Sequence, residues 1–150
     1  MNPAIKKDRG FTLIEMLLCL AILGVLAAVA LPVFSNYIEE TNQAKVFDHY
    51  HHASHSAKLT FSKAHMQGSL GLEPDVPQTA QEWIAVLNTL NGRAPGGGNA
   101  YIEGAANNET GQVGVQASGI FPDSASVTFH LPAYGQLPAQ TKTIVANEQN

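Results

Sequence analysis

A long apolar segment near the N-terminus constrains this chain more than any other feature. From Phe11 to Phe34 the side chains are mostly Leu, Ile, Val and Ala, and Glu15 is the only charged one. A helix crosses the hydrocarbon core of a bilayer with about 20 apolar residues, whereas a buried helix of a soluble domain is usually shorter and keeps a polar face. The sequence therefore predicts a membrane-spanning helix over residues 11–34, with a soluble core helix as the alternative.

Glu15 is the unusual residue of this segment. A charged side chain at the centre of a lipid-facing helix costs about 2.5–3.5 kcal/mol on insertion scales. The carboxylate is therefore expected to meet a partner. In the alternative interpretation it lies near the headgroups, only about 7 Å into the helix at roughly 1.5 Å per residue, and stays solvated.

The ten residues before Phe11 carry a net charge of plus two, from charged side chains at positions 6–9. The positive-inside rule places this end in the cytoplasm and carries the rest of the chain outward. An ordinary secretory signal would have a small-residue cleavage site after the apolar run, and the alanines of 27–30 leave that alternative open.

Residues 6–15 read Lys-Lys-Asp-Arg-Gly-Phe-Thr-Leu-Ile-Glu, and Leu31-Pro32 follows near the end of the apolar run. This pattern resembles the class III leader of type IV pilins and pilin-like proteins, over about the first 40 residues. The resemblance implies that residues 1–10 are a leader, that a prepilin peptidase cuts between Gly10 and Phe11, and that the new amino group of Phe11 is N-methylated.

The resemblance also implies assembly through this helix. In a bundle of such helices the Phe11 amine of one subunit can approach the Glu15 carboxylate of a neighbour. Such an ion pair would fix the register, because a single unpaired member is strongly penalised. Gly24 and Pro32 both weaken a helix. The resemblance implies a curved helix that loosens between them in a filament, and an inert membrane kink is the alternative.

Composition limits the remainder of the chain. Without its first ten residues the chain has 140, with five basic and eleven acidic side chains. A net charge of minus six argues against specific nucleic-acid binding. Cys19 is the only cysteine, so no intrachain disulfide can form, in contrast to many major pilins. We therefore expect packing and backbone pairing alone, or a metal, to hold the exported part, and no cofactor is predicted.

After Pro32 the helical pattern continues as an amphipathic helix over 35–68. Its expected apolar stripe follows three- and four-residue spacings and consists of Phe34, Ile38, Ala44, Phe47, Tyr50, Ala53, Ala57, Phe61 and Ala64. Gly68 is expected to end it.

Residues 69–150 are expected to form a small globular domain. Thr79 and Glu82 have the spacing of a capping box, which predicts a short helix over 79–91, anchored by Trp83. Short strands are predicted at 100–103, 113–118, 125–131 and 141–146. The predicted fold is α+β, with a long N-terminal helix packed on a small antiparallel sheet, and the pilin resemblance implies the same arrangement.

Histidines cluster within 49–55. On a helix, Asp48, His52 and His55 lie within about 60° of one another and are candidate ligands for zinc, nickel or copper. One helical turn supplies too few ligands for a closed site, so we favour a polar helix face without a metal. The loop oxygens of 107–110 and Asp123 invite comparison with the calcium loops of certain secretion pseudopilins, but turn formation is the favoured interpretation. No catalytic motif is found, and no enzyme is predicted.

The predicted function is that of a structural subunit of a type IV pilus or pilus-like filament, which supports adhesion, twitching motility or DNA uptake. The implied partners are the prepilin peptidase, identical or related pilin subunits, an inner-membrane assembly platform and, before assembly, membrane lipid. The precursor would be a single-pass inner-membrane protein that later enters an extracellular filament or a periplasmic pseudopilus. The alternatives are a pseudopilin of a type II secretion system and a signal-anchored exported binding domain that never polymerises.

Overall fold

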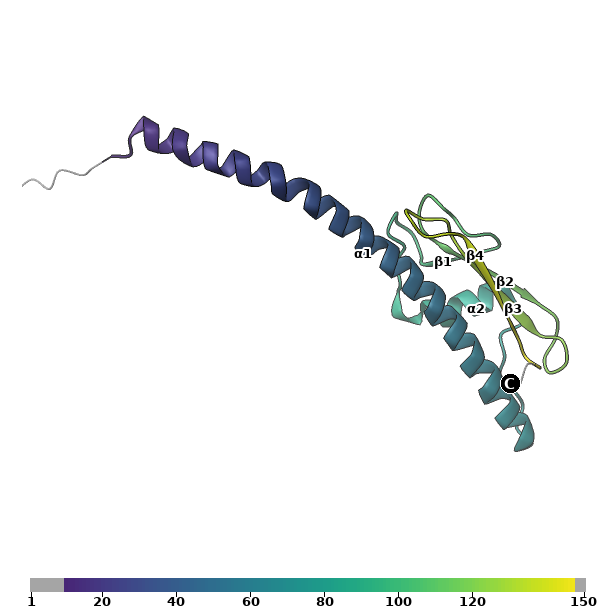
Figure 1. Ribbon diagram of the computed structural model, residues 1–150. Helices are drawn as coiled ribbons and strands as arrows, with labels where there is room; N and C mark the ends of the chain where they lie inside the picture. Colours follow the sequence, from purple (N-terminus) through teal and green to yellow (C-terminus); the bar gives the residue numbers. More distant parts are fainter. Residues whose placement is uncertain (1–9, 148–150) are drawn as a thin grey trace, which may run out of the picture. The chain divides into compact units, whose positions relative to one another are not determined.

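The computed structural model describes residues 10–147 (Figure 1). The chain divides into two compact units, one ending at Ile38 and one beginning at Glu39. Its elements are α1 (Leu13–Ser69), α2 (Ala80–Leu87), a 3-10 turn (Asn88–Leu90), β1 (Tyr101–Glu103), β2 (Val113–Ser118), β3 (Ser126–Leu131) and β4 (Gln140–Val145). The predicted α+β class is confirmed.

The first unit consists of the part of α1 up to Ile38. Every described side chain from Gly10 to Thr41 is exposed. Pro32 lies inside the helix and removes one backbone donor there. The Ser35 hydroxyl donates a hydrogen bond to the Pro32 carbonyl oxygen at 3.0 Å.

In the second unit α1 carries a continuous buried stripe. Its members are Val46, Tyr50, Ala53, Ser54, Ala57, Phe61 and Ala64. The prediction is confirmed from Tyr50 onward, but its earlier members are exposed: Phe34, Ile38, Ala44 and Phe47. Helical spacing extended backward from Tyr50 reaches Val46, which fills the inward position that the sequence analysis gave to Phe47.

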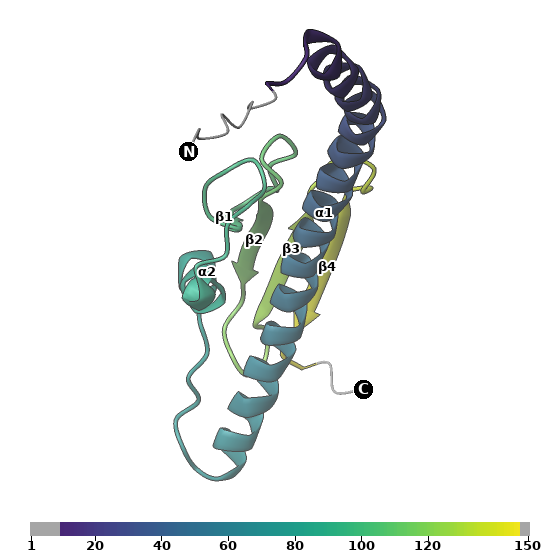
Figure 2. The same cartoon turned by 90° about the vertical axis from the view of Figure 1, so that its left-hand side faces the viewer.

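The four strands form one sheet in the order β1-β2-β3-β4 (Figure 2). β2 pairs antiparallel with β3, and β3 pairs antiparallel with β4. β1, however, runs parallel to β2, with Tyr101 opposite Val113. The sheet is therefore mixed, and the prediction of a wholly antiparallel sheet is wrong at this edge.

The path of the β1–β2 connection explains the parallel pair. The chain leaves β1 and returns to the start of β2, so that its backbone at 104–106 lies directly against Gly114. A Cβ atom at Gly114 would collide with the Gly104 carbonyl oxygen and with the backbone of residues 105 and 106. Glycine thus lets the connection cross closely over β2.

The core of the second unit lies between α1 and the sheet. Trp83 of α2 is 1 % exposed, and its ring meets that of Phe61 at 5.5 Å between centroids. α2 begins with the predicted capping box: the Thr79 hydroxyl accepts a bond from the Glu82 N–H, and the Glu82 carboxylate accepts one from the Thr79 N–H. The predicted anchor and cap are confirmed.

Candidate functional site

The start of α1 is organised by Thr12 and Glu15. The Thr12 N–H and the Thr12 hydroxyl donate to Glu15 Oε2 at 2.9 Å and 2.7 Å. In return, the Glu15 N–H donates to Thr12 Oγ1 at 3.3 Å. These contacts form a second reciprocal capping box, which satisfies two free donors at the helix terminus.

The carboxylate that the sequence analysis marked as costly in lipid thus bonds within its own first helical turn. A negative charge at this position also interacts favourably with the helix dipole. The sequence analysis missed Thr12, although the Thr-x-x-Glu spacing that identified Thr79 and Glu82 is also present here.

Gly10 and Phe11 precede the helix, which begins at Leu13. Both residues are exposed, and the Phe11 side chain is 78 % accessible. A side chain at position 10 would meet no atom within 4 Å, so contacts within the described chain do not require glycine there. The charged positions 6–9 of the predicted leader lie outside the described residues.

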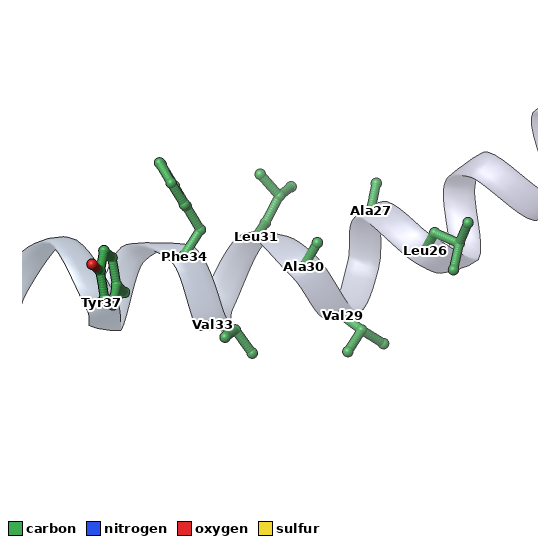
Figure 3. A pocket seen from close by; sticks show the side chains of 8 residues that line it. All are labelled: Leu26, Ala27, Val29, Ala30, Leu31, Val33, Phe34 and Tyr37. Carbon is green, nitrogen blue, oxygen red and sulfur yellow. The ribbon is translucent and has the colours of Figure 1, made fainter.

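The apolar part of α1 has no described packing partner. Among the described residues, α1 is the one helix long and apolar enough to cross a membrane, a property that signal sequences share, and none of its most apolar window is buried. Figure 3 shows eight of its apolar-stretch side chains, which leave the helix in several directions. They are Leu26, Ala27, Val29, Ala30, Leu31, Val33, Phe34 and Tyr37.

Gly24 and Pro32 lie within this stretch of helix. A side chain added at Gly24 would meet no atom within 4 Å. Neither packing within the described chain nor a positive φ angle accounts for glycine at this position.

The weak metal candidates Asp48, His52 and His55 all lie on α1. Among residues 10–147 no group of three or more His, Cys, Asp or Glu side chains is placed to hold a metal ion. His52 Nδ1 lies 3.2 Å from the Tyr101 hydroxyl, which donates to the His49 carbonyl oxygen at 3.0 Å. No local sequence pattern could have indicated Tyr101, because it is about 50 positions away in the chain.

Two other histidines of α1 also contact later parts of the second unit. His49 Nε2 lies 3.3 Å from the Arg93 carbonyl oxygen, and His65 Nε2 lies 2.7 Å from that of Ala146. Burial lowers the pKa of His49, and its bond to the Arg93 carbonyl partly offsets this effect. These histidines therefore contribute polar contacts between α1 and the rest of the second unit.

Two of the loop oxygens considered as calcium ligands accept hydrogen bonds from backbone N–H groups. Asn107 Oδ1 accepts bonds from the N–H groups of Glu109 and Thr110 at 2.9 Å and 3.3 Å. Asn108 Oδ1 accepts one from the Ala133 N–H at 2.9 Å. The Asn107 bonds are the local contacts by which Asn stabilises turns, whereas the Asn108 bond joins two loops that are 25 positions apart.

Comparison with known proteins identifies the N-terminal segment. Residues 5–31 match the family model of the prokaryotic N-terminal methylation motif. The chain is 42 % identical over 41 residues to fimbrial protein EcpC of Eikenella corrodens, covering 27 % of each chain. It is 46 % identical over 39 residues to fimbrial protein Q of Moraxella bovis and to the type IV major fimbrial protein FimA of Dichelobacter nodosus, covering 26 % of this chain and 25 % of each relative.

No solved structure matches the chain significantly. The chain matches only about a quarter of the length of each of these curated relatives. The family model covers the motif around Gly10 and most of the apolar run. The chain thus carries the prokaryotic N-terminal methylation motif and is similar, over part of its length, to type IV fimbrial proteins.

Proposed function

We propose that this chain is a structural subunit of a type IV pilus or pilus-like filament, and not an enzyme. The observation that carries the proposal is the apolar half of α1, most of which lies within the matched methylation motif and all of whose side chains are exposed in the single chain. Exposed apolar area is stabilised by about 25 cal/mol per Å² when it leaves water. Lipid would cover this surface in the precursor, and related subunits would cover it in the filament.

Processing is proposed to occur between Gly10 and Phe11. This bond precedes the helix and is exposed on both sides, so a prepilin peptidase could bind it as an extended peptide. Cleavage would create an amino group at Phe11, and N-methylation would keep its positive charge.

Glu15 is proposed to link processing to assembly. In the single chain its carboxylate is held by Thr12, which lowers the cost of carrying it in the membrane. In the filament the carboxylate would pair with the Phe11 amine of a neighbouring subunit. A helix in the wrong register would leave one charge unpaired, at a cost of several kcal/mol.

Gly24 and Pro32 are proposed to adapt the helix to its neighbours. Both weaken a helix, and no contact within the described chain explains the glycine. The stretch between them would loosen on assembly, after insertion of the precursor in the inner membrane and its extraction by an assembly platform.

Processing can be tested by producing the full chain with and without a prepilin peptidase and measuring intact masses. We expect the mass to fall by residues 1–10 only when the peptidase is present. Gly10→Val should block this change, because the bulky side chain next to the bond would hinder the peptidase. Gly24→Ala is the matched control and should be processed normally.

Cleavage after the alanines of 27–30, or no cleavage at all, would contradict the proposal and favour a conventional exported domain. Location separates the two assembly alternatives. A processed chain that is retained in the periplasm would favour the secretion pseudopilin over the surface pilus.

A further inference from the structure

The two edge strands of the sheet differ in length and in whether a neighbouring helix lies beside them. β1 has three residues, and α2 lies beside it, with Gln81 Nε2 donating to Glu103 Oε2 at 3.2 Å. β4 has six residues and pairs only with β3 among the described strands. Figure 2 shows β4 at the edge away from β1 and α2.

β4 has the properties of a strand to which another strand could be added. All of its residues except Ile144 are exposed, and it contains neither glycine nor proline. Its last three residues, 143–145, are β-branched and favour extended structure. An open edge of this kind presents unpaired N–H and C=O groups to any strand that approaches it.

The occupant most available to this edge is β4 of a second copy. Each copy carries the same strand, and two antiparallel strands can pair about a two-fold axis, so that each satisfies the other. Such pairing would join two sheets into one and would extend the core-facing layer of side chains across the junction.

Lys142 lies where this junction would form. It is directly opposite Phe129 in the register, and residues opposite each other project from the same face of a sheet. Phe129 is 0 % exposed in the core, so Lys142 projects from the core-facing side, where it remains exposed at the open edge. No ion pair is recorded for Lys142 within residues 10–147.

We propose that Lys142 keeps the β4 edge unpaired and so prevents a second copy from docking there. A strand placed against β4 would remove water from the ammonium group without supplying a counter-charge, which opposes pairing. Inward-facing charges on edge strands commonly act in this way. The inference does not depend on the proposed filament role, because it concerns an interaction between sheets.

The main test compares three variants of the full chain with the unaltered chain, all in detergent micelles, and a fourth variant serves as a reserve. Lys142→Val removes the charge from the edge, whereas Lys58→Val removes the same charge from the exposed face of α1. Lys142→Glu retains a charge at the edge but reverses its sign. Sedimentation gives the oligomeric state, and infrared absorption reports intermolecular strands.

We expect Lys142→Val to form dimers and larger species, with additional intermolecular sheet. At the same protein concentration the unaltered chain, Lys58→Val and Lys142→Glu should each keep one oligomeric state. Lys142→Thr places a third threonine between Thr141 and Thr143 and should associate to a smaller extent. It serves as the test variant if Lys142→Val does not fold. The inference is overturned if folded Lys142→Val and Lys142→Thr behave as the unaltered chain does. Equal association of Lys58→Val or Lys142→Glu would also overturn it.

Discussion

The two parts of α1 belong to one continuous helix but differ in what surrounds them. Up to Ile38 the helix is almost wholly apolar and every described side chain is exposed. Beyond Glu39 its composition is mixed, and an inward stripe from Val46 to Ala64 is buried. The more apolar part of α1 is thus the part that the described chain leaves uncovered, and we propose that lipid or related subunits cover it.

The two capping boxes repeat this contrast on a smaller scale. Thr79 and Glu82 start a helix whose packing lies within the second unit. Thr12 and Glu15 start a helix whose apolar side chains have no partner in the described chain. The same local device therefore serves folding in one region, and we propose that it serves assembly in the other.

The largest expected effect is on filament incorporation, and it should differ between the two capping glutamates, Glu15 and Glu82. Glu15→Ala should lower incorporation into filaments at least about tenfold, because removing one member of a buried ion pair costs about 3–5 kcal/mol. Processing between Gly10 and Phe11 should continue. Immunoblots of sheared filaments and of membranes measure both quantities.

Glu82→Ala is the matched control, because it removes the carboxylate of the other capping box. It should leave filament yield unchanged as long as the domain folds. Normal yield with Glu15→Ala would refute the assembly role of that residue.

The second prediction compares one aromatic residue from each part of α1. Phe61→Ala should lower the free energy of unfolding by about 3–5 kcal/mol, because it leaves a cavity beside Trp83. Phe34→Ala should change it by less than about 0.5 kcal/mol, as is usual for an exposed site. Denaturant titration of the full chain in detergent, followed by Trp83 fluorescence, measures both. Equal losses would mean that the two parts of the helix are packed alike.

The third prediction concerns the cap of α2. Thr79→Ala should cost about 0.5–2 kcal/mol of unfolding free energy, because the Glu82 N–H loses its acceptor. Thr12→Ala should leave the unfolding of the second unit unchanged. The same titration measures both variants, and an equal loss from Thr12→Ala would remove the distinction between the two caps.

The smallest expected effect is a pH dependence that originates in the second unit. The pKa of His49 is lowered in the folded state by burial, whereas an unfolded histidine titrates near about 6.5. The unfolded chain therefore binds more protons between the two pKa values. The contribution of His49 to stability is full above pH about 6.5 and falls as the pH drops toward the folded pKa.

His49→Gln, which retains a donor for the Arg93 carbonyl, should reduce this dependence. Unfolding midpoints measured from pH 7.5 down to 5 provide the test. An unchanged slope in the variant would exclude His49 as its source.

Much of this structure could be predicted from local sequence. Short-range patterns determine the extent of α1, the cap at Thr79 and the approximate strand positions, and the structure confirms them. The direction of β1 could not be predicted, because it depends on the connection that crosses Gly114. The contacts of His49 and His52 with Tyr101 could not be predicted either, because they join residues about 50 positions apart in the chain. The cap at Thr12 was predictable, because Thr12 and Glu15 have the same spacing as Thr79 and Glu82.

The most direct test of the account is the intact mass of subunits in filaments sheared from the native cell. We expect a species that begins at N-methylated Phe11 and lacks residues 1–10. A chain that is absent from filaments and either retains Met1 or begins after the alanines of 27–30 would contradict it.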